Sequence, residues 1–106
     1  VYPGTHDNDT SRGWMRQLEP DTLERFRSIG GGDPKRPERA LIRMAWSSPG
    51  RTAIASMQDL LGLGSKARLN RPGVALGNWV WRMAPGAATR TLARRLRRLT
   101  QDAGRL

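Results

Sequence analysis

The order of strand-like and helix-like segments constrains the fold of this chain more than any other feature. Residues 1–2 have strand character, and residues 18–30, 37–47 and 89–103 have the apolar spacing of helices. Between the second and third helical segments, residues 52–58 form a short run of small and apolar side chains. Such a run is typical of a parallel strand that is covered on both faces. The strand–helix–strand–helix order therefore predicts an α/β protein with parallel strands.

The length of the chain limits how complete this fold is. At 106 residues it is long enough for one domain with a modest core. Two strand–helix units cannot close a (β/α)8 barrel, which takes about 250 residues. Glycine and proline dominate residues 62–77 and predict a long irregular loop. We therefore expect residues 1–106 to be part of a larger α/β domain, helix-rich as an isolated chain, with no second domain.

Composition excludes several classes of protein. The sequence has no cysteine, which excludes disulfide and thiolate chemistry and fits a reducing cytoplasm, the location that we predict. No stretch approaches the roughly 18 uninterrupted apolar residues of a membrane span, so no membrane partner is expected. The sequence indicates no metal site and no cofactor.

The net charge of +10 favours a different class, a small basic module that binds nucleic acid. Six arginines gather near the end of the chain, at positions 90, 94, 95, 97, 98 and 105. However, Leu92, Leu96 and Leu99 give residues 89–103 an ordinary apolar stripe, which places the arginines on the solvated side. We therefore keep this function as an alternative and expect no nucleic-acid partner.

The first candidate site follows the first strand-like segment. Residues 4–10 read GTHDNDT and contain the pair His6-Asp7. In barrel enzymes the ends of strands carry catalytic side chains, because the strands are rigid and the loops above them are open to substrate. The same residues are also good turn and N-cap formers, so this heptad alone leaves a structural role for Asp7 open.

The second candidate site follows the second predicted strand. Gln58 and Asp59 lie at its end, and Asp59 suits either a site or a cap of the next helical turn. Asn70 precedes Arg-Pro-Gly and suits either a binding role or a turn. Trp79 and Trp81 are two residues apart and face opposite ways in an extended chain, so one can be buried while the other offers a flat apolar surface.

Taken together, four blocks of this sequence resemble the C-terminal end of the 4-α-glucanotransferases (amylomaltases or disproportionating enzymes), glycoside hydrolase family 77 of the α-amylase superfamily. The blocks occur in the same order and with matching gaps: GTHDNDT with RGW in residues 4–14, QDLLGLGS in 58–65, AR, N and PG in 67–73, and GNW with WR in 77–82. Lys66, Leu69 and Val74 differ from the family pattern, which leaves the preferred glucan chain open.

The resemblance implies a fold and a reaction. The fold would be the last part of a (β/α)8 barrel, from the end of its seventh strand to its final helix. The reaction would be retaining transfer of an α-1,4-glucan segment to the 4-hydroxyl of an acceptor sugar. The nucleophilic Asp and the acid/base Glu would precede Val1, so the chain would require the N-terminal remainder of the barrel and be inactive alone. A hydrolase of the same superfamily is the other alternative.

The resemblance also implies roles for individual residues. Asp7 would be the carboxylate that stabilises the transition state, and His6 would bind the sugar next to the cleaved bond. Asn70 would contact the glucan. Gln58 and Trp79 are weaker substrate-binding candidates, for which a structural role is the preferred interpretation.

Overall fold

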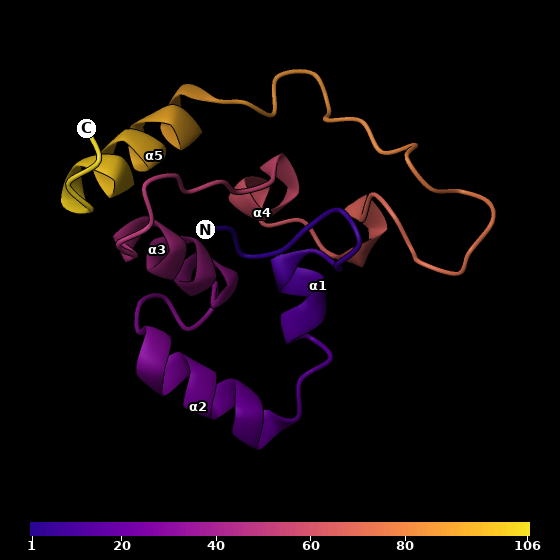
Figure 1. The fold of residues 1–106 in the computed structure, drawn as a ribbon, viewed down its shortest axis with the longest axis horizontal. Helices are drawn as coiled ribbons and strands as arrows, with labels where there is room; N and C mark the ends of the chain where they lie inside the picture. The colour runs from indigo at the N-terminus through magenta and orange to yellow at the C-terminus, as the bar shows by residue number, and fades with distance from the viewer.

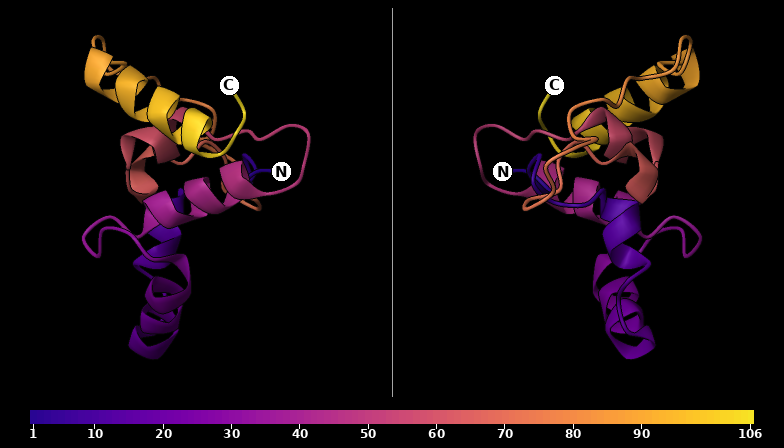
Figure 2. Two further views of the ribbon diagram at one scale, coloured as in Figure 1. Left: turned by 90° about the vertical axis from the view of Figure 1, so that its left-hand side faces the viewer. Right: turned by 90° about the vertical axis from the view of Figure 1, so that its right-hand side faces the viewer.

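The computed structural model describes residues 1–106 and is built from helices joined by irregular segments, without a β-strand. The elements are α1 (Ser11–Met15), α2 (Pro20–Gly30), α3 (Glu38–Ser47), α4 (Met57–Leu61), the short 3-10 helix η1 (Ser65–Ala67) and α5 (Arg90–Asp102). α3 lies between α2 and α5, which point to opposite ends of the molecule (Figures 1 and 2). The three helices predicted from apolar spacing are confirmed, with ends that differ by one or two residues.

The strand predicted over residues 52–58 is wrong, because residues 52–56 form no β-strand and α4 begins at Met57. The Ser56 hydroxyl caps this helix by accepting a hydrogen bond from the N–H of Asp59. Residues 52–56 are extended and form one parallel pairing with Val1. The Val1 amino group donates to the Thr52 carbonyl at 2.7 Å, and the Ile54 N–H donates to the Val1 carbonyl at 2.9 Å. The pairing goes no further because Pro3 has no N–H to donate.

The two faces of this extended segment have different surroundings. Ala53 and Ala55 are half-buried, whereas Ile54 and Ser56, which alternate with them, are exposed. Ala55 packs against the apolar core, so the face that it shares with Ala53 is turned toward the helices. The expectation that both faces are covered is therefore wrong for this chain. The face of Ile54 and Ser56 lies open.

The core is small and joins three helices. Ile42 of α3, Leu60 of α4 and Leu92 of α5 form its buried centre, and the half-buried Leu96 and Leu99 pack against them. These contacts confirm the apolar stripe predicted for α5. They hold α5 against the rest of the chain although it follows a long irregular segment that runs away from the helices (Figure 1).

Shortening Leu92 to alanine is expected to release α5. A leucine-to-alanine change in a packed core costs about 2–5 kcal/mol, and a core of this size has little to replace the lost contacts. Trypsin cleavage at the arginines within α5 is expected to become roughly tenfold faster or more, because cleavage follows the open population. Leu76→Ala is the control, since Leu76 is 85% exposed. Equal cleavage rates for the two variants would contradict a docking role for Leu92.

The arginines near the end of the chain divide into two groups. Four of them are exposed, as predicted: those at positions 90, 94, 97 and 98. Two are not on a solvated face, which corrects the prediction. Arg95 donates a hydrogen bond to the Leu60 carbonyl, and Arg105 donates to the carbonyls of Trp46, Ser48 and Gly50. They serve packing, because they satisfy carbonyls at the ends of α3 and α4.

None of the helices is long and apolar enough to span a membrane.

Candidate functional site

A tight turn of residues 5–8, called here the Asp7 turn, presents His6 and Asp7. The Asn8 side-chain oxygen accepts hydrogen bonds from the Thr5 N–H at 2.7 Å and the Thr5 hydroxyl at 3.1 Å. The Asp7 N–H donates to the Thr5 hydroxyl oxygen at 3.3 Å. Just beyond the turn, Thr10 caps α1 by accepting from the Gly13 N–H at 3.0 Å. The backbone N–H groups of this heptad are thus bound by its threonines, by Asn8 and by Asp9, whose Oδ1 accepts from the Thr10 N–H at 2.7 Å.

The Asp7 carboxylate takes no part in this capping, because it accepts no backbone N–H. Its Oδ1 accepts a hydrogen bond from the Asn70 amide at 2.6 Å and lies 3.4 Å from the His6 Nε2. The side chains of His6 and Asp7 are 55% and 50% exposed. No Lys or Arg nitrogen pairs with this carboxylate. The carboxylate is therefore oriented by a neutral amide and forms no ion pair with a Lys or Arg.

Trp79 lies beside His6 and has an unusual backbone. The two ring centroids are 5.2 Å apart and the rings are tilted by 43°. Trp79 has a φ of 62°, a left-handed conformation that is uncommon for a residue other than glycine. Its N–H donates to the Leu69 carbonyl at 2.7 Å, and its side chain is largely exposed. Trp79 is thus the tryptophan of the pair that offers a flat surface, while Trp81 is half-buried.

Gln58 and Asp59 are both buried and both bind backbone. The Gln58 amide donates to the Ala67 carbonyl at 3.2 Å, at the end of η1. The Asp59 Oδ1 accepts from the Ser11 N–H at 2.7 Å, at the start of α1. Asp59 therefore does not cap the next helical turn, since it lies inside α4 and Ser56 caps that helix. Its carboxylate instead accepts at the start of α1, 48 positions away.

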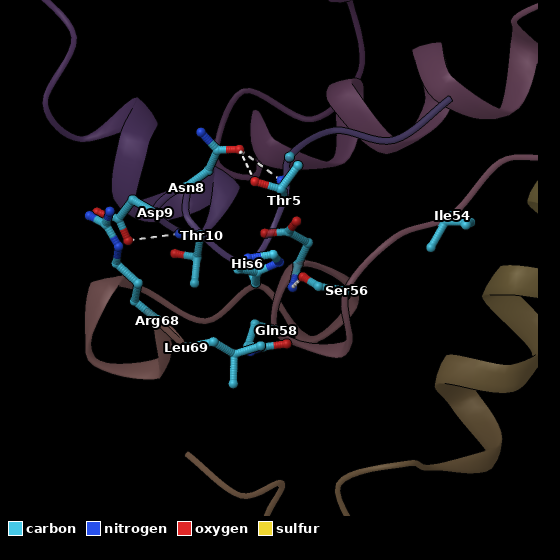
Figure 3. A pocket seen from close by; sticks show the side chains of 12 residues that line it. Thr5, His6, Asn8, Asp9, Thr10, Ile54, Ser56, Gln58, Arg68 and Leu69 are labelled. Atoms are coloured by element: carbon cyan, nitrogen blue, oxygen red, sulfur yellow. Dashed lines mark hydrogen bonds between the residues drawn. The ribbon is translucent and has the colours of Figure 1, made fainter. Parts of the chain in front are cut away.

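A hollow lies between the loop of residues 4–10 and the extended segment that leads into α4 (Figure 3). Its twelve lining residues include His6 and Thr10 on one side, and Ser56 and Gln58 on the other. Only two of the twelve are hydrophobic residues. Asp7, which follows His6 in the turn, is not among the twelve.

Two residues that support the site were not among the predicted site residues. Asp9 accepts hydrogen bonds from the Ser65 hydroxyl at 2.7 Å and from the Gln17 amide at 3.0 Å. Arg68 donates to the Asp7 carbonyl and to the Asn70 carbonyl, both at 2.7 Å. Both residues belong to the sequence blocks quoted above. Spacing alone does not reveal their roles, because their partners are up to 61 positions away.

Comparison with known proteins places these residues in a family context. The family model described as 4-alpha-glucanotransferase matches residues 1–89. The chain is 45% identical to a chloroplastic/amyloplastic 4-alpha-glucanotransferase of Arabidopsis thaliana, with 100% of this chain and 19% of that protein aligned. It is 39% identical to the 4-alpha-glucanotransferase of Thermus thermophilus, with 100% and 22% aligned.

A solved structure agrees with these relatives. The amylomaltase of Streptococcus agalactiae, in complex with acarbose, superposes with a TM-score of 0.91 at 30% identity. The match covers 98% of this chain and 21% of the amylomaltase chain. The chain thus spans about a fifth of the length of the relatives that it matches.

Proposed function

This chain belongs to the 4-alpha-glucanotransferase family, and on that premise we propose that it supplies the stabilising carboxylate of a glucan-transferring active site. The observation that carries the proposal is the state of Asp7: a half-exposed carboxylate, oriented by Asn70 and free of any paired Lys or Arg. We propose that the reaction is retaining transfer of an α-1,4-glucan segment to the 4-hydroxyl of an acceptor sugar.

The chemistry of such a transfer requires a negative charge at this place. In the first step a nucleophilic carboxylate forms a bond to the anomeric carbon, while an acid gives its proton to the departing glycosidic oxygen. In the second step the same acid/base group removes the proton of the acceptor hydroxyl. The oxygen of that hydroxyl then bonds to the anomeric carbon and displaces the nucleophilic carboxylate. Both transition states carry positive charge on the sugar ring. An anion about 4 Å away stabilises such charge by about 4 kcal/mol at a dielectric typical of a protein surface.

The nucleophile and the acid/base are proposed to come from outside these 106 residues. Two carboxylates line the hollow, those of Asp9 and Asp59, and both are engaged in structural hydrogen bonds. Asp9 holds Ser65 and Gln17, and Asp59 holds the start of α1. Asp7 alone is left for chemistry, whereas a retaining mechanism needs two further carboxyl groups flanking the bond. The remaining four fifths of the relatives' length provides room for them.

The remainder of a (β/α)8 barrel also fits the open face of this chain. Val1 and residues 52–54 form one parallel pairing, the arrangement of adjacent strands in such a barrel. Ile54 is exposed on the face opposite the one that packs on the core, as a side chain of a barrel interior would be. We propose that residues 1–106 form the end of the barrel, from its seventh strand to its last helix.

The other predicted site residues are proposed to contact the sugar or to shape its surroundings. His6 lines the hollow, and its imidazole is a hydrogen-bond partner for a ring hydroxyl. Trp79 offers an exposed ring beside it, suited to the apolar face of a sugar. The Asn70 amide donates one hydrogen bond to Asp7. We propose that its other hydrogen-bonding groups bind the glucan. Gln58 lines the hollow, and its amide donates to the Ala67 carbonyl at the end of η1. We propose that it shapes the surroundings of the sugar.

The test uses what we call the assembled enzyme, in which this chain replaces the matched segment of the Thermus thermophilus relative. Incubated with maltotriose, the assembled enzyme is expected to produce glucose together with longer oligosaccharides. The chain alone is expected to produce neither, because a lone stabilising carboxylate does not break the bond. Transfer by the chain alone, or a folded but inactive assembled enzyme, would refute the proposal.

The same experiment separates the alternatives. A hydrolase would convert maltotriose to shorter products without longer ones. Neither the family match nor the relatives favour a hydrolase or a nucleic-acid-binding module. A cytoplasmic location stays a prediction, since the Arabidopsis thaliana relative is named chloroplastic/amyloplastic.

A further inference from the structure

We infer that Arg68 is a positioning residue that fixes the Asp7 carboxylate by holding the backbone of its turn. The inference rests on the proposed function, since it assigns Arg68 a role in the reaction through Asp7. Arg68 belongs to one of the sequence blocks that carry the resemblance, but it is not among the predicted site residues. Figure 3 shows its side chain reaching from its own loop toward the turn that precedes α1.

The geometry is a closed set of three hydrogen bonds. The Arg68 Nε donates to the Asn70 carbonyl at 2.7 Å, and its Nη2 donates to the Asp7 carbonyl at 2.7 Å. The Asn70 amide then donates to the Asp7 carboxylate at 2.6 Å. Arg68 thereby fixes the backbone on both sides of the contact between Asn70 and Asp7. A change at Arg68 moves the donor and the acceptor of that contact together.

Arg68 binds the backbone of the Asp7 turn and Asn70 binds the Asp7 side chain, so no ion pair forms with the charge that the reaction needs. Arg68 places its guanidinium on backbone carbonyls and forms no ion pair with the Asp7 carboxylate. A salt bridge would offset the negative charge and stabilise the carboxylate before the reaction as well as during it. Interactions accelerate a step only when they are stronger in the transition state. The cation therefore holds the turn, and a neutral amide orients the acid.

The two loops are also joined without Arg68. The Ser65 hydroxyl donates to Asp9 at 2.7 Å, and the Ser11 N–H donates to Asp59 at 2.7 Å. Arg12 donates to the Gly62 carbonyl at 2.9 Å. These bonds hold the base of the loops, so loss of Arg68 is expected to disturb the Asp7 turn while the fold survives.

The test is Arg68→Lys in the assembled enzyme. Lysine keeps the charge but is a single point donor, so it cannot bridge two carbonyls as the guanidinium does. We expect kcat to fall about 10- to 100-fold with KM changed less than about threefold, as for a displaced catalytic group. Arg71→Lys is the matched control, because Arg71 is exposed in the same loop and its side chain makes no hydrogen bond. It is expected to stay within about twofold of the parent.

A double-mutant cycle with Asp7→Asn distinguishes positioning from a general structural role. If Arg68 acts through Asp7, adding Arg68→Lys to Asp7→Asn is expected to cause almost no further loss of kcat. The inference would be overturned if the fold-losses of kcat in the two single variants multiplied in the double variant, or if Arg68→Lys left kcat unchanged. If Arg68→Lys lowers the melting temperature, Arg68→Gln is measured in the same cycle with the same expectation.

An inactive parent would refute the proposed function, and this inference with it. An active parent with an inactive Asp7→Asn and an unaffected Arg68→Lys would refute this inference alone.

Discussion

Asp7→Asn is expected to lower the turnover of the assembled enzyme by about 10²- to 10³-fold or more, the range seen when one electrostatic contact to a transition state is lost. Asparagine has nearly the same shape and can still accept the hydrogen bond from the Asn70 amide through its side-chain oxygen. What it lacks is the charge. The loss therefore measures the electrostatic role of Asp7 with little change in packing. Initial rates of glucose release from maltotriose give kcat directly.

Folding is expected to survive this substitution. The Asp7 side chain is half-exposed and accepts no backbone N–H, so no buried group loses its partner. Unchanged circular dichroism and melting temperature would show this. Asp21→Asn is the control, because Asp21 lies exposed in the first turn of α2, and it should leave turnover unchanged. Near-normal transfer by Asp7→Asn would mean that the residue serves only the loop.

Apolar spacing predicted α3 and α5 well because each contributes a stripe to a shared core, whereas α2 has the same spacing but buries none of its residues. Ile42 of α3 and Leu92 of α5 occupy that core as their spacing indicated. The strand prediction failed at Met57 because a short apolar run looks the same whether it ends in a strand or in a helix. Ser56 was the available signal, since a serine ahead of this turn is a good N-cap.

The candidate site shows where sequence reasoning reaches its limit. His6, Asp7, Asn70 and Trp79 lie close together, and their roles in the reaction stay predictions. Residue types and spacing do not show which side chain accepts which bond across a gap of about 60 positions. Arg68 falls in this class. Its role depends on tertiary geometry alone.

Glu38 is the largest omission, since no motif marks the region before α3. It begins that helix and is 1% exposed, the most deeply buried charged residue of the chain. Its Oε1 accepts from the Arg36 Nε at 2.7 Å, and its Oε2 has no partner. Burial, then the repulsion of Arg39 and Arg36, lowers the pKa of Arg95, and Glu38 acts in the opposite direction. One buried carboxylate thus offsets three neighbouring arginines.

Glu38→Gln is therefore expected to destabilise the assembled enzyme by about 3 kcal/mol, at the low end for breaking a buried ion pair because Arg36 keeps some contact with water. Glutamine fills the same space but carries no charge, so the three guanidinium groups would repel each other without compensation. They cannot escape by losing a proton, since arginine stays charged in proteins. Urea unfolding measures the loss, and Glu19→Gln is the control because Glu19 is exposed and makes no side-chain cap bond. Equal stability of the two variants would mean that packing, and not the charge of Glu38, joins α3 to α4 and α5.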